Sequence, residues 1–428
     1  MKHVIGKGKT LIVDGPASMI FLSGSVRVLG AELSVGEKVV IREGKRIAFE
    51  SGNEATVDLM LGEGASFEEI EGSTVPPSWE EASKTIISYG KPVIVMIIGG
   101  IDSGKTSFCT FLSNVALMEG CNVAVIDADV GQSDIGPPST IGLGYVTKPI
   151  KDLFDLEANN LYFVGSTSPN GAIDRVVEGI TTLVKRALDS GINFLIINTD
   201  GWTEGEDAKA YKVLLVQRVA PTVVVGMQQQ NELKSILDEL KDTKVLEAAS
   251  PVAIKRRDRE KRKILREMGY KKYLSKAKVR SFPLSWVKVE GARFKPSFSP
   301  PRNRVETISE ILGAHPLYWV ETPEAFFIIL KEGQRTSWDG MNRIEEALGK
   351  KAKLIRQGEE EGLLVALQND HEGFLGIGIL CGIDYERRIM KVYTSAKENV
   401  STVCIGQVKL DKMGREIGLS YVFTDCCS

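Results

Sequence analysis

The pattern of apolar and polar positions changes twice along the 428-residue chain. Residues 1–88 hold short apolar runs separated by Gly-containing turns, which is typical of a small sandwich or barrel. In residues 89–285, apolar runs alternate with helical patterns, which predicts a doubly wound α/β domain. Residues 286–428 are again β-rich with some helix. We therefore expect an α/β protein whose central parallel-sheet domain is flanked by a small N-terminal β domain and a C-terminal β-rich domain.

The apolar run 93–98 leads directly into the clearest motif of the chain. It is rich in β-branched residues and predicts a buried parallel strand. Residues 99–106 then match G-x-x-x-x-G-K-[ST], and residues 107–112 continue with helical spacing. A strand before the motif and a helix after it are the context in which this sequence forms a phosphate-binding P-loop, or Walker A motif.

The P-loop predicts how a nucleotide would be held. Its glycines let the backbone wrap around phosphates, and the amide groups at the helix N-terminus face the anion. Lys105 is expected to reach the β- and γ-phosphates, and the Thr106 hydroxyl to ligate Mg²⁺. The predicted ATP-binding residues are Gly99, Gly100, Ile101, Asp102, Ser103, Gly104, Lys105, Thr106 and Ser107.

Two later apolar runs end in residues suited to the same crevice. The run 123–126 ends in Asp127 and Asp129, which leave a strand on one side and resemble a Walker B element for Mg²⁺ or a base. The run 194–197 leads to Trp202, whose position after Gly201 favours the crevice over the core. A late strand is followed by Gln-Gln-Gln-Asn and not by the Asn-Lys-x-Asp that recognises guanine, so we expect ATP.

Composition narrows the class of protein. Hydrophobic residues make up 43% of the chain and charged residues 26%, the values of an ordinary globular protein. No apolar run reaches the length of a membrane span, and the N-terminus lacks a signal-peptide pattern. The six cysteines and three histidines show no zinc spacing, which indicates reduced thiols. We expect a cytoplasmic protein, or a nuclear one if the source is eukaryotic.

The net charge of −2 conceals one strongly basic segment. Residues 255–280 hold thirteen Lys or Arg and three acidic residues, a local charge of +10 that leaves −12 on the remainder. Ile264, Leu265 and Met268 predict a helix that docks by a narrow apolar stripe. Such a segment attracts phosphates of a nucleotide or of a nucleic acid. Tyr270 and Tyr273 within it are suited either to stacking or to packing.

Together these motifs resemble those of the polynucleotide 5′-hydroxyl kinases related to the messenger-RNA cleavage-factor kinase and its ribosomal-RNA-processing cousin. The P-loop carries the internal acid of that family, Asp102. Residues 127–132 match D-x-D-x-G-Q, and residues 199–202 match T-x-G-W. Residues 165–169 resemble the family's clasp, with Ser168 where relatives often have Thr. The basic segment resembles the family's lid helix.

The resemblance implies that the γ-phosphoryl group of ATP is transferred to the 5′-hydroxyl end of RNA or DNA, with Mg²⁺ as cofactor. It implies partners among RNA-processing proteins and no membrane. Asp129 would orient and deprotonate the hydroxyl and, with Thr106, lie at the metal. The other catalytic residues would be Lys105, Arg257 and Arg262, and the substrate-binding residues Gln132, Thr167 and Trp202.

Two alternatives from other classes remain open. Some members of the family bind ATP without turnover and serve as scaffolds in RNA-processing complexes, although the presence of Lys105, Asp129, Arg257 and Arg262 argues against this here. A P-loop ATPase of the metal-insertion or partitioning type also pairs a P-loop with an acidic strand end. The basic segment and Trp202 favour a nucleic-acid acceptor over that ATPase.

Overall fold

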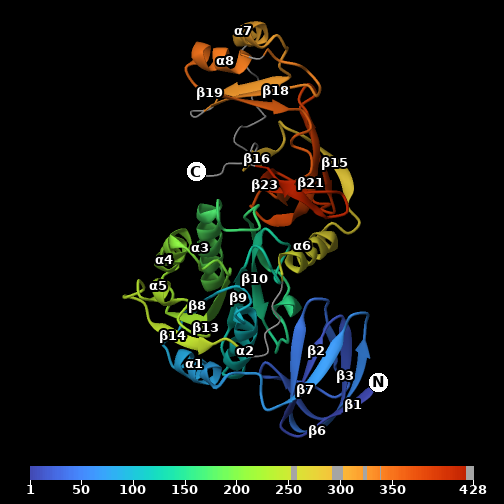
Figure 1. Cartoon of the computed structure of the whole chain (residues 1–428), viewed down its shortest axis with the longest axis vertical. Coiled ribbons are helices and arrows are strands. Elements are labelled where there is room, and N and C mark those ends of the chain that lie inside the picture. The colour runs from blue at the N-terminus through green and yellow to red at the C-terminus, as the bar shows by residue number, and fades with distance from the viewer. Residues whose placement is uncertain (252–257, 292–301, 322–324, 338, 421–428) are drawn as a thin grey trace. The chain divides into compact units, whose positions relative to one another are not determined.

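The computed structural model describes residues 1–251, 258–291, 302–321, 325–337 and 339–420 (Figure 1). The chain divides into two compact units. The first unit combines Met1–Tyr162 with Ser168–Leu265, and the second combines Phe163–Thr167 with Arg266–Ser428. The compact units do not test the three domains predicted from the sequence, so their boundaries at residues 88 and 285 stay a prediction.

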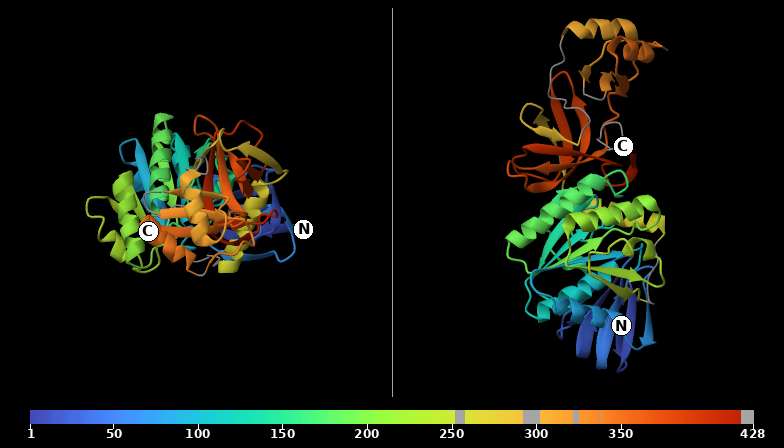
Figure 2. Two further views of the ribbon diagram at one scale, coloured as in Figure 1. Left: turned by 90° about the horizontal axis from the view of Figure 1, so that it is seen from above. Right: turned by 90° about the vertical axis from the view of Figure 1, so that its left-hand side faces the viewer.

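The first seven strands form one sheet, drawn in blue in Figures 1 and 2. They are β1 (Lys2–Ile5), β2 (Lys9–Asp14), β3 (Ala17–Val28), β4 (Ala31–Glu32), β5 (Lys38–Ile41), β6 (Arg46–Leu61) and β7 (Ser66–Glu71). Their pairings are antiparallel, with β6 between β3 and β2. Buried and less buried side chains alternate along β3 and β6, because successive residues of a strand point to opposite faces. The inward residues form an apolar core.

A second sheet of seven strands lies at the centre of the first unit, in the order β11-β10-β9-β12-β8-β13-β14. The elements of this domain are α1 (Pro77–Ile87), β8 (Val93–Gly99), α2 (Lys105–Met118), β9 (Val123–Ala128), β10 (Thr140–Val146), a 3₁₀ turn (Leu153–Asp155), β11 (Asn160–Phe163), α3 (Ile173–Asp189), β12 (Phe194–Thr199), α4 (Glu206–Val219), β13 (Val223–Gln228), α5 (Lys234–Leu237) and β14 (Val245–Ala249). Strands β9, β12, β8, β13 and β14 are parallel, and β10 runs antiparallel to β9. The predicted α/β class is therefore confirmed.

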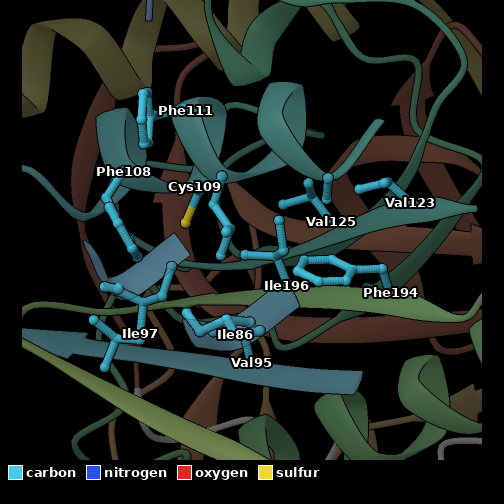
Figure 3. Close-up of a cluster of buried hydrophobic side chains, with 14 of the residues drawn as sticks. Ile86, Val95, Ile97, Phe108, Cys109, Phe111, Val123, Val125, Phe194 and Ile196 are labelled. Carbon is cyan, nitrogen blue, oxygen red and sulfur yellow. The ribbon is translucent and has the colours of Figure 1, made fainter. Parts of the chain in front are cut away.

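Helices α1 and α2 cover one face of this sheet. Figure 3 shows Ile86 of α1 and Phe108 of α2 among the side chains of the central strands, Val95, Ile97 and Ile196 included. Because helices enclose a parallel sheet, its central strands are continuous apolar runs without alternation. This packing fixes the strand order and so places the ends of β9, β12 and β8 side by side.

The turn between β5 and β6 joins the N-terminal sheet to the central domain. Lys45 Nζ lies 2.7 Å from one carboxylate oxygen of Asp134 and 3.4 Å from Asp152. The Arg42 guanidinium pairs with Asp134 at 3.2 Å and lies 3.5 Å from the centre of the Phe154 ring. Burial alone would raise the pKa of Asp152, but the two cations hold that pKa below its ordinary value.

The second unit holds a sheet in the order β15-β22-β21-β20-β23-β16, with β24 on β23. Its strands are β15 (Lys278–Pro283), β16 (Lys288–Glu290), β20 (Leu363–Gln368), β21 (Phe374–Asp384), β22 (Ile389–Thr394), β23 (Thr402–Leu410) and β24 (Glu416–Leu419). Between β16 and β20 the chain adds α7 (Arg302–Leu312), β17 (Tyr318–Glu321), β18 (Ala325–Leu330), α8 (Gly340–Leu348) and β19 (Lys351–Arg356). This region is β-rich with some helix, as predicted.

The basic segment forms α6 (Arg259–Tyr273), which begins in the first unit and ends in the second. The predicted apolar stripe is wrong in part, since Ile264 and Met268 are each 45% exposed. Leu265 does dock, against the turn at Gly44. In the second unit the helix is held by Tyr270, which is fully buried, and by a bidentate pair between Arg266 and Glu416. Tyr270 therefore packs and does not stack on a ligand.

Gly142 of β10 gives a test of how tightly the loop before this strand is packed. A Cβ atom there would lie 1.6 Å from the backbone oxygen of Ile135. We expect Gly142→Ala to lower the free energy of unfolding by about 1–3 kcal/mol, measured by calorimetry, because the backbone itself must move. The matched change Gly52→Ala in β6 meets its nearest atom at 3.6 Å and should be close to neutral. Equal losses in both variants would contradict this account of the loop.

Candidate active site

The P-loop, residues 99–106, runs from the end of β8 into the first turn of α2. Asp102 within it takes a left-handed φ of +54°, which is unusual for a residue other than glycine. The Lys105 side chain is buried, and its Nζ donates to the carbonyl oxygens of Gly99 at 2.9 Å and Gly100 at 2.7 Å. Burial lowers the pKa of Lys105, and the Asp129 carboxylate opposes this shift. The loop and the helix N-terminus together form an anion site.

Asp127, at the end of β9, is almost fully buried and is surrounded by donors. One oxygen accepts from the Asn198 side-chain amide at 2.9 Å, and the other from the backbone N–H of Asp134 at 2.6 Å and of Ile135 at 3.3 Å. Burial raises the pKa of Asp127 to about 7, and the neighbouring carboxylates of Asp134 and Asp129 add to the shift. Asp127 thus fixes the loop that follows β9.

Asn198 is a site residue that the sequence analysis missed. Its amide nitrogen also lies 3.5 Å from the Thr106 hydroxyl, so it joins the P-loop threonine to Asp127. Asn198 stands near the end of β12, the strand that pairs with both β8 and β9. A polar residue near the end of an otherwise apolar strand was the available signal.

Asp129 projects from the same loop with different partners. Its Oδ1 accepts from the backbone N–H of Gly131 at 3.1 Å and of Gln132 at 3.0 Å. Burial raises the pKa of Asp129, and the nearby Lys105 ammonium lowers it. A carboxylate with a raised pKa is better suited to accept a proton at neutral pH. Asp127 is therefore placed to hold the loop, and Asp129 to face the phosphate site.

The turn after β12 touches the P-loop through Gly201. A Cβ atom on Gly201 would lie 2.7–2.9 Å from atoms of Ile101, two of them backbone atoms. The next residue, Trp202, is partly exposed, and its backbone N–H donates to Asp200 at 2.9 Å. Its ring stacks on Tyr211, with 5.7 Å between ring centres. Trp202 is thus held beside the phosphate site.

Arg262 of α6 contacts the P-loop as well. Its guanidinium lies 3.9 Å from the Asp102 carboxylate, and its backbone oxygen accepts from the Gln132 side chain at 3.1 Å. Arg257 lies outside the described residues. Thr167 belongs to the second unit, where the neighbouring Gly165 accepts a backbone hydrogen bond from Gln407 at 2.7 Å. The first unit therefore brings together Lys105, Thr106, Asp129, Gln132, Trp202 and Arg262.

Several features of these residues fit a nucleotide with Mg²⁺. Within the described residues, the buried hydroxyl oxygen of Ser103 in the P-loop and the amide oxygen of Asn198 in β12 have no hydrogen-bond partner in the protein. No group of three or more His, Cys, Asp or Glu in the described part of the chain could hold a metal. Magnesium at a P-loop needs no such group, because one hydroxyl, one carboxylate and the phosphates suffice.

The site combines a phosphate-binding loop between β8 and α2 with an acidic loop at the end of β9, and β12 lies between these two strands in the sheet. This combination defines a P-loop nucleotide-binding protein. Residues 99–276 match the sequence model of the mRNA cleavage and polyadenylation factor CLP1 P-loop family. This match confirms the predicted resemblance to that family over the P-loop domain.

Relatives extend this result over most of the chain. A polyribonucleotide 5′-hydroxyl-kinase of Methanocaldococcus jannaschii is 28% identical over 355 residues, which cover 81% of this chain and 94% of the relative. One of Pyrococcus horikoshii is 29% identical, with coverages of 81% and 93%. A chain of the solved wild-type Clp1p–Pcf11p complex superposes with a TM-score of 0.65, covering 96% of this chain and 97% of its own length. At 13% identity this last likeness shows the fold alone.

The contact between Gly201 and Ile101 predicts that the turn after β12 supports nucleotide binding. Gly201→Ala would push against the P-loop backbone, so we expect its affinity for ATP to fall about tenfold, roughly the effect of 1.4 kcal/mol, in a calorimetric titration. Gly90→Ala is the control, because nothing lies within 4 Å of the added Cβ. Unchanged affinity in folded Gly201→Ala would show that the loop tolerates displacement.

Proposed function

We propose that this protein is an ATP-dependent polynucleotide kinase that phosphorylates the 5′-hydroxyl end of RNA, with DNA as a second acceptor. The observation that carries the proposal is the position of Arg262, which extends from a strongly basic helix to the P-loop acid Asp102. We assign Asp129 and Trp202 to the same site. The archaeal relatives named polyribonucleotide 5′-hydroxyl-kinases support the same activity.

The phosphate end of the site comprises residues 99–107, which hold ATP. Mg²⁺, held by Thr106 and Asp129, would neutralise charge on the phosphates. Lys105 and Arg262, with Arg257 from outside the described residues, neutralise the charge that develops on the transferred group. The 5′-hydroxyl oxygen bonds to the γ-phosphorus, its proton passes to Asp129, and the bond to the β-phosphate oxygen breaks to release ADP.

Gln132 and Trp202 of the first unit form the acceptor end of the site in this proposal, and Thr167 is proposed as a substrate-binding residue from the sequence resemblance alone. Trp202 offers its ring for stacking on the terminal base, an interaction worth about 1–3 kcal/mol per base. RNA-processing proteins are the protein partners that we propose, and the solved Clp1p–Pcf11p complex is a precedent for such an assembly. We propose the cytoplasm as compartment, or the nucleus in a eukaryote. None of the described helices combines the length and the apolar character needed to cross a membrane.

The proposal is tested by mixing the protein with γ-labelled ATP, Mg²⁺ and a 5′-hydroxyl oligoribonucleotide, beside a reaction without acceptor. Label on the oligonucleotide, lost in Lys105→Ala, supports a kinase. Hydrolysis of ATP without transfer would overturn the proposal in favour of a P-loop ATPase. Binding of ATP without hydrolysis or transfer would overturn it in favour of a non-catalytic, ATP-binding scaffold.

Replacement of Asp129 separates a base from a binding residue. Asp129→Asn keeps the size of the side chain and loses both its charge and its basicity. We expect the single-turnover rate of transfer to fall by at least about a hundredfold, the usual scale of general base catalysis, while the affinity for ATP changes little. A comparable loss of ATP affinity would make Asp129 a binding residue.

Two neighbouring cations of α6 provide a matched pair. Arg262 faces Asp102, whereas the Lys261 side chain is 60% exposed and lies 3.8 Å from Asp258. Arg262→Ala should lower the rate at saturating substrates by on the order of a hundredfold or more, and Arg262→Lys should restore it only in part. Lys261→Ala should weaken oligonucleotide binding and flatten its salt dependence, with the rate retained. Should both alanine variants change oligonucleotide affinity alone, α6 is a binding surface.

A further inference from the structure

Asp200 is the centre of a buried polar cluster next to the site. Its Oδ2 accepts from the Tyr211 hydroxyl at 2.8 Å and from Lys212 Nζ at 2.9 Å, and its Oδ1 accepts from the Trp202 backbone N–H at 2.9 Å. Lys212 Nζ also donates to the Asp200 carbonyl oxygen at 3.1 Å. Lys212 is fully buried and Tyr211 nearly so. The turn that carries Trp202 is therefore tied to two neighbouring residues of α4.

Tyr211 meets Trp202 a second time, through its ring. The two rings are stacked at an interplanar angle of 23°, with 5.7 Å between centres. Tyr211 is 1% exposed, whereas Trp202 stays partly exposed at the surface of the domain. The indole is thus backed by a ring whose own hydroxyl is anchored. Part of the Trp202 surface remains accessible.

A buried ion pair is a costly way to hold a turn. Removing Lys and Asp from water costs several kcal/mol per ion, and apolar residues of similar volume often stabilise a fold equally well. The pair also lies next to the P-loop, because Asp200 precedes Gly201, whose Cβ position would be 2.7–2.9 Å from atoms of Ile101. The location of the pair points to a role in the site rather than in the core.

We propose that Tyr211, fixed by Asp200 and Lys212, is a positioning residue for the acceptor, since it holds the Trp202 indole in one orientation for stacking with the terminal nucleobase. This inference rests on the proposed function. Holding the ring in advance removes rotamer entropy that the acceptor would otherwise have to offset on binding. Stacking accepts every base, so the arrangement favours polynucleotide ends without selecting a sequence.

A double-mutant cycle tests this proposal. Tyr211→Leu removes the aromatic backing and retains an apolar side chain. We expect KM for a 5′-hydroxyl oligonucleotide to rise about five- to tenfold, with kcat and KM for ATP within about twofold. In a Trp202→Ala background the same change should raise KM no further, because Tyr211 acts through Trp202. Tyr145→Leu, on β10, is the matched control and should behave as wild type.

Two results would overturn the proposal. One is an equal rise of KM in the Trp202→Ala background, and the other is a parallel rise of KM for ATP, as general damage would cause. Should Tyr211→Leu fail to fold, Tyr211→Phe keeps the ring and loses its anchor. Tyr211→Phe should raise KM for the oligonucleotide two- to threefold, and this rise should be absent in the Trp202→Ala background. A KM equal to that of the wild type in Tyr211→Phe would refute the anchoring role of the hydroxyl.

The same cycle can be measured as equilibrium binding of a fluorescent 5′-hydroxyl oligonucleotide, without turnover. If the wild-type protein binds the oligonucleotide but transfers no phosphate, the proposed kinase activity fails while the coupling between Tyr211 and Trp202 is still measured. If transfer occurs and the coupling is absent, only the positioning role fails.

Discussion

The carboxylate of Asp127 is the contact on which the geometry of the site depends. Its donors come from the β12 residue Asn198 and from the backbone of the loop that follows β9. Through Asn198 it is joined to Thr106 of the P-loop, and its Oδ1 also accepts from the backbone N–H of Asp129 at 3.4 Å. Because a buried carboxylate without donors is strongly unfavourable, the three parts hold one another in place.

Much of the fold and of the phosphate site could be predicted because the signals are local. A strand, a glycine-rich loop and a helix follow one another within twenty residues, so residues 93–112 contain the whole P-loop. Asn198 and the contact of Gly201 with Ile101 could not be predicted in this way. They depend on β12 lying between β8 and β9, and this strand order is set by packing across the sheet.

The basic segment, residues 255–280, shows how little charge alone predicts about the role of each residue. Its composition predicted one helix that attracts phosphates, and α6 does place Arg262 at the P-loop. The same helix also enters the second unit, where Arg266 pairs with Glu416 and Tyr270 joins the core. Glu416 lies 150 residues from Arg266 in sequence, and periodicity within a helix carries no information about such a partner. A single run of charge therefore contains residues for chemistry and residues for structure.

The ion pairs of Arg42 and Lys45 limit how this protein can be divided or recombined. A fragment that began at residue 89 would leave Asp134 and Asp152 without these cations, and the backbone N–H of Asp134 also donates to Asp127. The N-terminal sheet is therefore not an independent module that can be exchanged at will. In functional chimaeras between relatives, the cations of the β5–β6 turn and the two acids opposite should be inherited together.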